Sequence, residues 1–349
     1  MPANGRRDSP AEGRGLIRAE ACEVNLAHHC NLACRGCFHL SPILPKRYAD
    51  PVELRTKLSW LARCYRAGSL RLIGGEPLLH PDIPAVIAAV RESGVSSRLV
   101  VVTNGLLLGR MPDAFWAGVD KVRISSYPGK AMPGALLREC RRKAIRFGVD
   151  LRLALCPEFR EPFSIPGTED AGLVGRIYRT CLHAHVWQCH TVDAGYFYKC
   201  PQSRFIPAAL PDATFSPQED GIPIEDSPEF AGAVRSYLGS PVPLKSCRHC
   251  LGSVGKKFDH ELVERSTWAR RQDRPVEDLV DLECLARLEA RPSSDPGYGG
   301  AVYHLNRLRD YLRHLIAQRS LGAVAAALMP RLRRRHSPER TPPVAPSSG

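Results

Sequence analysis

The stretch EVNLAHHCNLACRGCF, residues 23–38, joins a short apolar strand at 23–26 to a loop that carries Cys30, Cys34 and Cys37. In a parallel α/β sheet, the loop that leaves the carboxyl end of a strand lies on the ligand-binding side. Soft thiolates at this spacing suit zinc or an iron–sulfur cluster. Because structural zinc usually takes four protein ligands, three clustered thiolates favour a [4Fe–4S] cluster with one iron open to an outside ligand.

Short apolar strands alternate with amphipathic helices from residue 23 to about residue 157. Strands are predicted at 23–26, 70–73, 98–103, 121–125 and 150–155, and helices at 52–67, 82–94, 112–118 and 133–147. In the first helix, Leu54, Leu58, Leu61 and Tyr65 would share one buried face. This alternation predicts an α/β fold with a parallel sheet and right-handed crossovers, open or rolled into part of a barrel.

Two glycine-containing turns follow the second and third predicted strands, Gly74-Gly75-Glu76-Pro77 and Thr103-Asn104-Gly105. Together with the Cys-x3-Cys-x2-Cys loop, and in this order, they resemble the motifs of the radical S-adenosylmethionine (SAM) superfamily. The resemblance implies a partial (β/α)6-type barrel in which Cys30, Cys34 and Cys37 hold a catalytic [4Fe–4S] cluster. SAM would chelate the open iron and be cleaved to a 5′-deoxyadenosyl radical, which abstracts hydrogen from the substrate.

The resemblance also implies contacts with SAM at the strand ends. Gly74 and Gly75 would let the backbone approach the methionyl ammonium, and Glu76 would balance its charge. Phe38 is expected near the adenine, with a plain core aromatic as the alternative. Asn104 ends the third strand, and Ser125, with Ser126, would lie near the ribose. Alternation along the fourth strand places Arg123 on the face of Ser125.

A second set of cysteines comprises Cys181, Cys200, Cys247 and Cys250. Residues 188–192 and 196–199 flank Asp193-Ala194-Gly195 and predict a β-hairpin. Four such thiols would hold zinc or a [4Fe–4S] cluster. Their order, with Gly-x4-Cys followed by Cys-x2-Cys, resembles the twitch module, a shortened SPASM domain that implies one auxiliary cluster. Cys189 is an alternative ligand to Cys181, and Cys284 alone follows, so a second auxiliary cluster is not expected.

Five segments are expected along the chain. They are a disordered N-terminus (1–20), a radical SAM core (21–160), a twitch/SPASM-like auxiliary cluster region (161–262), a helical C-terminal extension (263–335) with helices at 275–290 and 302–318, and a disordered tail (336–349).

Composition narrows the class of protein. The 49 Lys and Arg exceed the 36 Asp and Glu by 13, but much of the excess lies at the two ends of the chain, as in solvated basic tails. The sequence shows no basic face rich in aromatic residues, so nucleic-acid binding is not favoured. No apolar stretch reaches the roughly 18 residues of a membrane span, and the N-terminus lacks a signal-peptide core. We expect a cytoplasmic protein, in which 13 cysteines indicate metal ligation or redox chemistry.

The first functional hypothesis is a radical SAM enzyme, most simply an oxidoreductase, that acts on a small polyol, sugar or aminocyclitol by dehydrogenation or epimerisation. Arg123 is the candidate for holding a ketyl oxygen, and Cys156 is the candidate for returning a hydrogen atom in an epimerase. An electron donor such as flavodoxin or ferredoxin would be needed.

The alternative is a maturase that modifies a peptide or protein, with residues 263–330 as a region that could bind a partner. A metal-stapled scaffold or nucleic-acid-binding protein is the remaining hypothesis. It would require the glycine-rich turn at Gly74 and the three-thiol loop to be coincidences.

Overall fold

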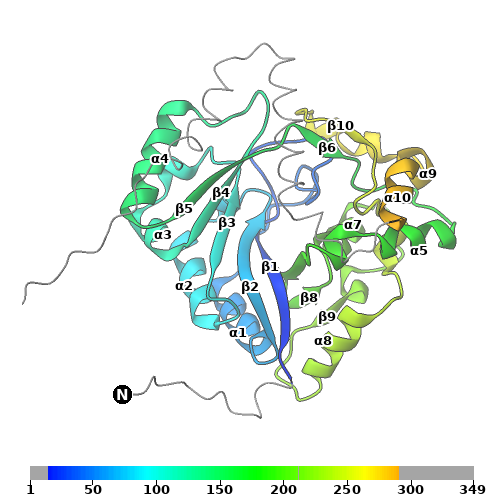
Figure 1. The fold of residues 1–349 in the computed structure, drawn as a ribbon, viewed down its shortest axis with the longest axis horizontal. Helices are drawn as coiled ribbons and strands as arrows, with labels where there is room; N and C mark the ends of the chain where they lie inside the picture. Colours follow the sequence, from blue (N-terminus) through cyan, green and yellow to red (C-terminus); the bar gives the residue numbers. More distant parts are fainter. Residues whose placement is uncertain (1–14, 211, 291–349) are drawn as a thin grey trace, which may run out of the picture. The chain divides into compact units, whose positions relative to one another are not determined.

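The computed structural model describes residues 15–210 and 212–290 (Figure 1). Its main sheet has eight strands in the order β5-β4-β3-β2-β1-β7-β8-β9. Strands β1 to β5 and β7 are parallel, whereas β8 and β9 are antiparallel to their neighbours. The strands are β1 (Ile17–Ala27), β2 (Tyr65–Gly74), β3 (Leu99–Thr103), β4 (Lys121–Ser126), β5 (Asp150–Leu155), β7 (His190–Asp193), β8 (Tyr196–Tyr198) and β9 (Gly221–Pro223).

Four helices connect the first five strands: α1 (Pro51–Leu61), α2 (Ile83–Ser93), α3 (Asp113–Gly118) and α4 (Gly134–Arg146). Because strands β1 to β5 follow one another in order, right-handed crossovers place all four helices on the same face of the sheet. Figure 1 shows α1 to α4 along that side. The predicted α/β fold with a parallel sheet is confirmed, and this unidirectional winding is that of part of a barrel.

The sixth parallel strand does not follow β5. It is β7, which pairs with β1 at the other side of the β1–β5 series. The chain after β5 instead forms β6 (Glu158–Arg160), which pairs with β10 (Lys257–Asp259) in a separate two-stranded sheet. This sheet lies close to the ends of β4 and β5 (Figure 1) and brings the two halves of the chain together there.

Two predicted boundaries are wrong at the start of the sheet. Strand β1 begins at Ile17, so residues 17–20 belong to the sheet although disorder is predicted there. Helix α1 ends at Leu61, and Tyr65 belongs to β2, where it pairs with Ile17. Leu54, Leu58 and Leu61 do share a buried face. Tyr65 fits the helical period by spacing, but pairing with β1 decides its conformation.

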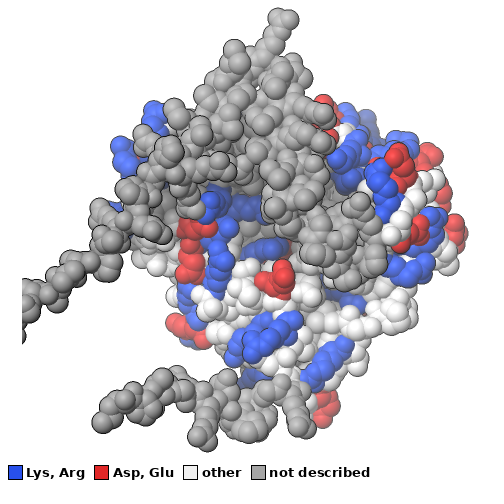
Figure 2. Space-filling model, in the orientation of Figure 1, with Lys and Arg blue, Asp and Glu red and all other residues white. Residues whose placement is uncertain are grey.

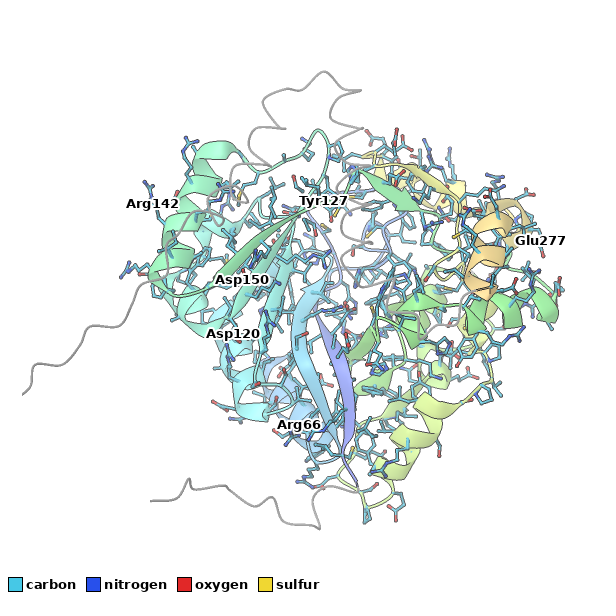
Figure 3. All side chains as sticks on the ribbon, in the orientation of Figure 1. Arg66, Asp120, Tyr127, Arg142, Asp150 and Glu277 are labelled. Atoms are coloured by element: carbon cyan, nitrogen blue, oxygen red, sulfur yellow. The ribbon has the colours of Figure 1, made fainter. Side chains whose placement is uncertain are left out.

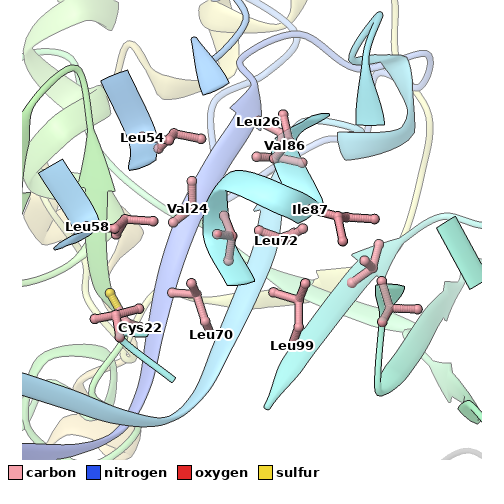
Figure 4. Close-up of a cluster of buried hydrophobic side chains, with 14 of the residues drawn as sticks. Cys22, Val24, Leu26, Leu54, Leu58, Leu70, Leu72, Val86, Ile87 and Leu99 are labelled. Atoms are coloured by element: carbon pink, nitrogen blue, oxygen red, sulfur yellow. The ribbon is translucent and has the colours of Figure 1, made fainter. Parts of the chain in front are cut away.

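The core lies between the sheet and the helices. In Figure 4, side chains of α1 (Leu54, Leu58) and α2 (Val86, Ile87) point toward those of three strands, which include Val24, Leu70 and Leu99. Alternation along the strands then directs Glu23, Arg123 and Ser125 to the opposite face of the sheet. We call this opposite face the inner face.

The remaining elements are mostly short. The predicted hairpin is confirmed as β7 and β8, joined at Ala194 and Gly195, which both have positive φ. Two helices, not one, occupy 275–290, because Asp281 caps a new helix there. The helix predicted at 302–318 and the tail at 336–349 lie outside the described residues. The helices are α5 (Ala171–Arg179), α6 (Leu182–His185), α7 (Pro201–Ala209), α8 (Phe230–Gly239), α9 (Val276–Leu279) and α10 (Leu282–Glu289), with 3-10 turns η1 (Pro77–Leu79), η2 (Leu108–Arg110), η3 (Pro217–Asp220), η4 (Lys245–Arg248), η5 (Arg265–Thr267) and η6 (Ala269–Gln272).

Within residues 15–210 and 212–290, no helix has both the length and the apolar character needed to cross a membrane.

Candidate functional site

The first cysteine loop follows β1 directly. Cys34 is buried and Cys30 and Cys37 are half-buried, and their thiols lie within electrostatic reach of one another. Burial raises the pKa of Cys30 to about 12 and also raises the pKa values of Cys34 and Cys37. The nearby backbone of Ser41 and His39 opposes the rise in the pKa of Cys37. Without a metal these thiols stay protonated, and metal binding would have to displace their protons.

The glycines of the second motif are required by the path of this loop. A Cβ on Gly75 would lie 2.1 Å from the carbonyl oxygen of His29, and one on Gly74 would lie 2.4 Å from that of Ala27. Gly74 also has a φ of +133°, which L-residues rarely adopt. The family resemblance predicts that these glycines let the backbone approach a ligand. The structure adds a separate reason, which is close packing against the chain that leaves β1.

Glu76 is completely buried at the end of β2. Its carboxylate accepts hydrogen bonds from the Thr103 hydroxyl (2.6 Å), the Asn104 backbone N–H (2.8 Å) and the Leu78 N–H (3.1 Å). Burial raises the pKa of Glu76 to about 7, although these hydrogen bonds oppose the shift. In the described part of the chain, no Lys, Arg or His forms an ion pair with it. A buried carboxylate in this state favours a cationic ligand.

Asn104 joins the third motif to the first. Its side-chain N–H donates to the Asn31 side chain (2.7 Å), and its Nδ2 lies 3.9 Å from the Cys30 sulfur. The three motifs, which the sequence separates by about 70 residues, are therefore linked by hydrogen bonds at the carboxyl ends of β1, β2 and β3.

Phe38, predicted near the adenine, directly follows Cys37 of the first cysteine loop. Phe38 stacks on the ring of His183, with centroids 4.0 Å apart. Tyr127, which sequence reasoning missed, lies where β4 ends, at the opposite end of the sheet from Asp120 and Asp150 (Figure 3). Its pKa is raised by burial and by the charges of Cys156, Cys34 and Cys37. Cys156 and Tyr127 are therefore close to the first cysteine loop.

Arg123 and Ser125 lie on the inner face of the sheet. Arg123 is exposed, and its charge acts on the buried carboxyl of Glu23, which pairs with Arg71 at 3.2 Å. Burial raises the pKa of Glu23. Asn25, on the same face by alternation, is 1% exposed and its amide has no hydrogen-bond partner among the described residues. Figure 2 shows acidic and basic side chains interspersed with uncharged ones on the visible face.

Residues 255–272 hold the first cysteine loop from the other side, which the sequence did not predict. Arg35 pairs with Glu161 (2.6 Å) and Glu261 (2.9 Å), and its guanidinium lies 3.9 Å from the centre of the Phe258 ring. Cys34 forms a β-bridge with Leu262. Phe258 also leaves no room at Gly36 for a side chain, since a Cβ there would lie 2.5 Å from the Phe258 ring.

Arg265 and Trp268 bind the main chain of the same loop. The Arg265 guanidinium donates to the carbonyl oxygens of Cys30, Leu32 and Pro42. The Trp268 indole N–H donates to the carbonyl oxygen of Cys34 at 2.8 Å. No local sequence pattern marks these residues, because each contact spans more than 200 positions of the chain.

The second cysteine set surrounds a cavity. Cys181, Cys200, Cys247 and Cys250 all line it, and it encloses about 380 Å³ that protein atoms do not fill, part of it open to solvent. Burial raises the pKa of Cys200 to about 12 and also raises those of the other three thiols. Across the described ranges, no three Cys, His, Asp or Glu side chains are arranged to hold a single metal ion.

Cys189 does not line this cavity, although its thiol is within electrostatic reach of Cys181 and Cys200. Its sulfur interacts with the carboxyl group of Glu23 and lies 4.0 Å from Nδ1 of His183. Of the two alternative thiols, Cys181 is the one that the structure places in the cavity wall.

Residues 24–126 match the family model of the Radical SAM superfamily. The matched region contains the first cysteine loop and both glycine-containing turns. It also contains the carboxyl end of β1 and all of β2 and β3, the strands that these segments follow. This chain therefore has a radical SAM domain. The match ends at Ser126 and does not include the second cysteine set.

Several relatives share this region. The GTP 3′,8-cyclase of Chlorobaculum tepidum is 36% identical over 97 residues, 28% of this chain and 29% of that protein. The PqqA peptide cyclase of Streptomyces rochei is 29% identical over 128 residues, 35% of each chain. The chain thus spans about a third of the length of these relatives. The solved structure of BtrN in complex with AdoMet and 2-DOIA is 16% identical and aligns with 65% of this chain and 83% of that one, at a TM-score of 0.39.

Proposed function

We propose that this chain is a radical SAM enzyme that abstracts hydrogen from a small polyol, sugar or aminocyclitol, leading to dehydrogenation or epimerisation. The observation that carries the proposal is the buried Glu76 carboxylate, which lacks a cationic partner in the described chain and is hydrogen-bonded to the backbone of Asn104 next to Cys30. The methionyl ammonium of SAM would supply the missing positive charge.

The residues of the first loop fit a [4Fe–4S] cluster by their donor set. Cys30, Cys34 and Cys37 supply three soft thiols, and backbone N–H groups at Cys37 would stabilise its thiolate. If a cluster were bound there, it would supply, with SAM and an electron from a flavodoxin or ferredoxin, a 5′-deoxyadenosyl radical for hydrogen abstraction. The role of the chain's own residues is to hold the first cysteine loop in place, through Arg35, Arg265 and Trp268.

The inner face supports a polar substrate. Glu23, Asn25, Arg123 and Ser125 all come from strands at this face, and the unpaired amide of Asn25 offers both a donor and an acceptor for hydroxyl groups. Arg123 would hold the oxygen of a ketyl group. Glu23, whose pKa is raised by burial, is suited to accept the hydroxyl proton.

The second cysteine set supports dehydrogenation. Loss of a hydrogen atom from a carbinol carbon and of the hydroxyl proton converts an alcohol to a ketone only if one further electron leaves. An auxiliary [4Fe–4S] cluster in the cavity lined by Cys181, Cys200, Cys247 and Cys250 would supply a one-electron acceptor.

Epimerisation would need a different residue. Cys156 ends β5 near the first loop, where its thiol would return a hydrogen atom to the opposite face of the substrate. The thiyl radical left on Cys156 would have to take up one electron from the flavodoxin or ferredoxin and one proton to restore the thiol, so this reaction would not need an auxiliary electron acceptor. Cys156→Ala should then abolish epimer formation, and intact epimer formation in this variant would exclude the role of Cys156.

A peptide maturase is the second candidate, and a groove favours it. The groove holds about 1750 Å³, part of it open to solvent, and its lining includes Ile165, Val174, Phe215 and Leu244. Leu244 lines the four-cysteine cavity as well, so a bound peptide segment would lie beside that cavity. Such a groove would hold the apolar side chains of an extended segment.

The test is substrate-dependent cleavage of SAM. The reconstituted protein is reduced without oxygen and given panels of sugars, aminocyclitols or short peptides, with 5′-deoxyadenosine as the readout. We expect a polyol to increase 5′-deoxyadenosine formation and a carbinol deuterium to move into it. Stimulation by peptides alone would overturn the small-molecule assignment, and no cleavage under any condition would overturn the radical SAM activity.

A further inference from the structure

Lys199 is a buried cation next to the four-cysteine cavity. It is 1% exposed, directly precedes Cys200 and lines the cavity. Its ammonium donates to the Tyr178 hydroxyl (2.7 Å) and the Ser240 carbonyl oxygen (3.2 Å). Within the described ranges it forms no ion pair with a carboxylate, unlike the neighbouring Lys245, which pairs with Glu219.

Burying an ammonium in a low-dielectric protein interior without a counter-charge is unfavourable. Among the described residues, thiolates of Cys200 and Cys247 would be negative charges beside it in the cavity, and the buried Asp220 carboxyl acts on Cys200 from a neighbouring segment. Lys199, Cys200 and Cys247 all line the same cavity. The ammonium and the cysteine set therefore depend on each other electrostatically.

Gln202 gives a second, independent observation. It is 1% exposed and lines the same cavity, yet neither atom of its amide has a hydrogen-bond partner among the described residues. Buried amides are almost always hydrogen-bonded. The Gln202 amide N–H could be satisfied by a hydrogen bond to a cluster sulfur. The cavity wall therefore offers a positive charge from Lys199 and an N–H donor from Gln202, both suited to an anionic cluster.

We propose that Lys199, assisted by Gln202, is a positioning residue that raises the reduction potential of the auxiliary [4Fe–4S] cluster. This inference rests on the auxiliary cluster of the proposed function. Reduction adds one negative charge to the cluster, and that charge is stabilised by a fixed ammonium and by N–H donors to sulfur. The cluster then accepts the electron that the substrate releases.

The test is a redox titration of the reconstituted full-length protein, followed by electron paramagnetic resonance. Addition of SAM changes the signal of the first cluster and so identifies the second. Lys199→Met removes the charge and keeps the length of the side chain, Lys199→Arg restores the charge, and Gln202→Leu removes the amide. Lys245→Met is the matched control, because Lys245 is close to Cys247 but exposed and paired.

We expect the potential of the second cluster to become more negative in Lys199→Met, less so in Gln202→Leu, and to stay at the wild-type value in Lys199→Arg and Lys245→Met. The potential of the first cluster should not move. If Lys199→Met does not retain iron, the potential of the second cluster is measured in Lys199→Gln instead, where we expect the same negative shift. An unchanged potential with full iron content overturns the inference, whereas absence of a second cluster from wild type overturns the auxiliary site of the proposed function.

Discussion

The indole nitrogen of Trp268 donates a hydrogen bond of 2.8 Å to the carbonyl oxygen of Cys34, across 234 positions of the sequence. Trp268 is buried, and its ring stacks near Phe163. The first cysteine loop is thus held on one side by the strands from which it emerges and on the other by a segment far along the chain.

Trp268→Phe tests this support, because it keeps an aromatic ring and removes the donor. A buried carbonyl left without its partner costs about 1–3 kcal/mol. We expect the free energy of unfolding to fall by that amount and iron to be lost faster from the reconstituted protein. The control is Trp60→Phe in α1, because within the described residues the Trp60 indole donates no hydrogen bond. Equal iron loss in both variants would contradict a specific role for Trp268.

Gly75→Ala tests the close packing between the ends of β1 and β2. Its Cβ would meet the His29 carbonyl at 2.1 Å, so the backbone must shift. Overpacking of this kind typically costs about 1–3 kcal/mol, measured by chemical denaturation of the apo-protein. Gly232→Ala in α8, where no atom lies within 4 Å of the new Cβ, should leave stability unchanged or slightly higher. A stable Gly75→Ala protein would show that the two strand ends are further apart.

Glu76→Gln tests the cationic ligand. The pKa of Glu76 is raised to about 7 by burial, so its negative charge appears as the pH rises through that value. We expect wild type to bind SAM more tightly at pH 7.5 than at pH 6, and Glu76→Gln to bind weakly at both. Equilibrium dialysis with labelled SAM measures this, with the exposed Glu92→Gln as control. A wild-type pH profile in Glu76→Gln would exclude Glu76 as the partner of the ammonium.

Without SAM, the Glu76 carboxyl makes the fold less stable as the pH rises, whereas with SAM the same rise in pH strengthens binding. Because its pKa is higher in the folded state than the ordinary value of 4.5, the fold is favoured by the protonated form. Its stabilising contribution is complete below pH 4.5 and is lost as the pH rises through about 7. Wild type should therefore lose stability over this range relative to Glu76→Gln, as followed by denaturant titration.

Single replacements at Cys181 and Cys189 test which thiol belongs to the second set. Cys181 lines the four-cysteine cavity, whereas Cys189 lies by Glu23. Cys181→Ala should lower the bound iron of the second site, and Cys189→Ala should leave it near wild type. The reverse result would exchange the two ligand assignments.

The local part of the site could be predicted from the sequence. Cys30, Cys34 and Cys37 lie in one loop, and both turns directly follow apolar strands, so strand alternation and spacing alone bring them to one edge. The hairpin was predictable because the turn residues Asp193-Ala194-Gly195 separate two short runs, and the structure confirms a turn there with positive φ at Ala194 and Gly195.

The long-range part could not be predicted. Tyr65 has helical spacing with Leu58 and Leu61, and only its pairing with Ile17 places it in β2. Arg265 and Trp268 lie in a segment without a motif, and their role depends on the antiparallel pairing of β6 and β10, which brings that segment against the loop. Lys199 and Gln202 become informative only through burial and missing partners.

The most direct test of the two-cluster account is an iron count after anaerobic reconstitution. Wild type is compared with a variant in which Cys30, Cys34 and Cys37 are all Ala, and circular dichroism checks that both are folded. Because a cubane holds about four irons, the account predicts about eight in wild type and about four in the variant. About four irons in wild type and almost none in the variant would contradict the auxiliary cluster and leave the proposed dehydrogenase without its electron acceptor.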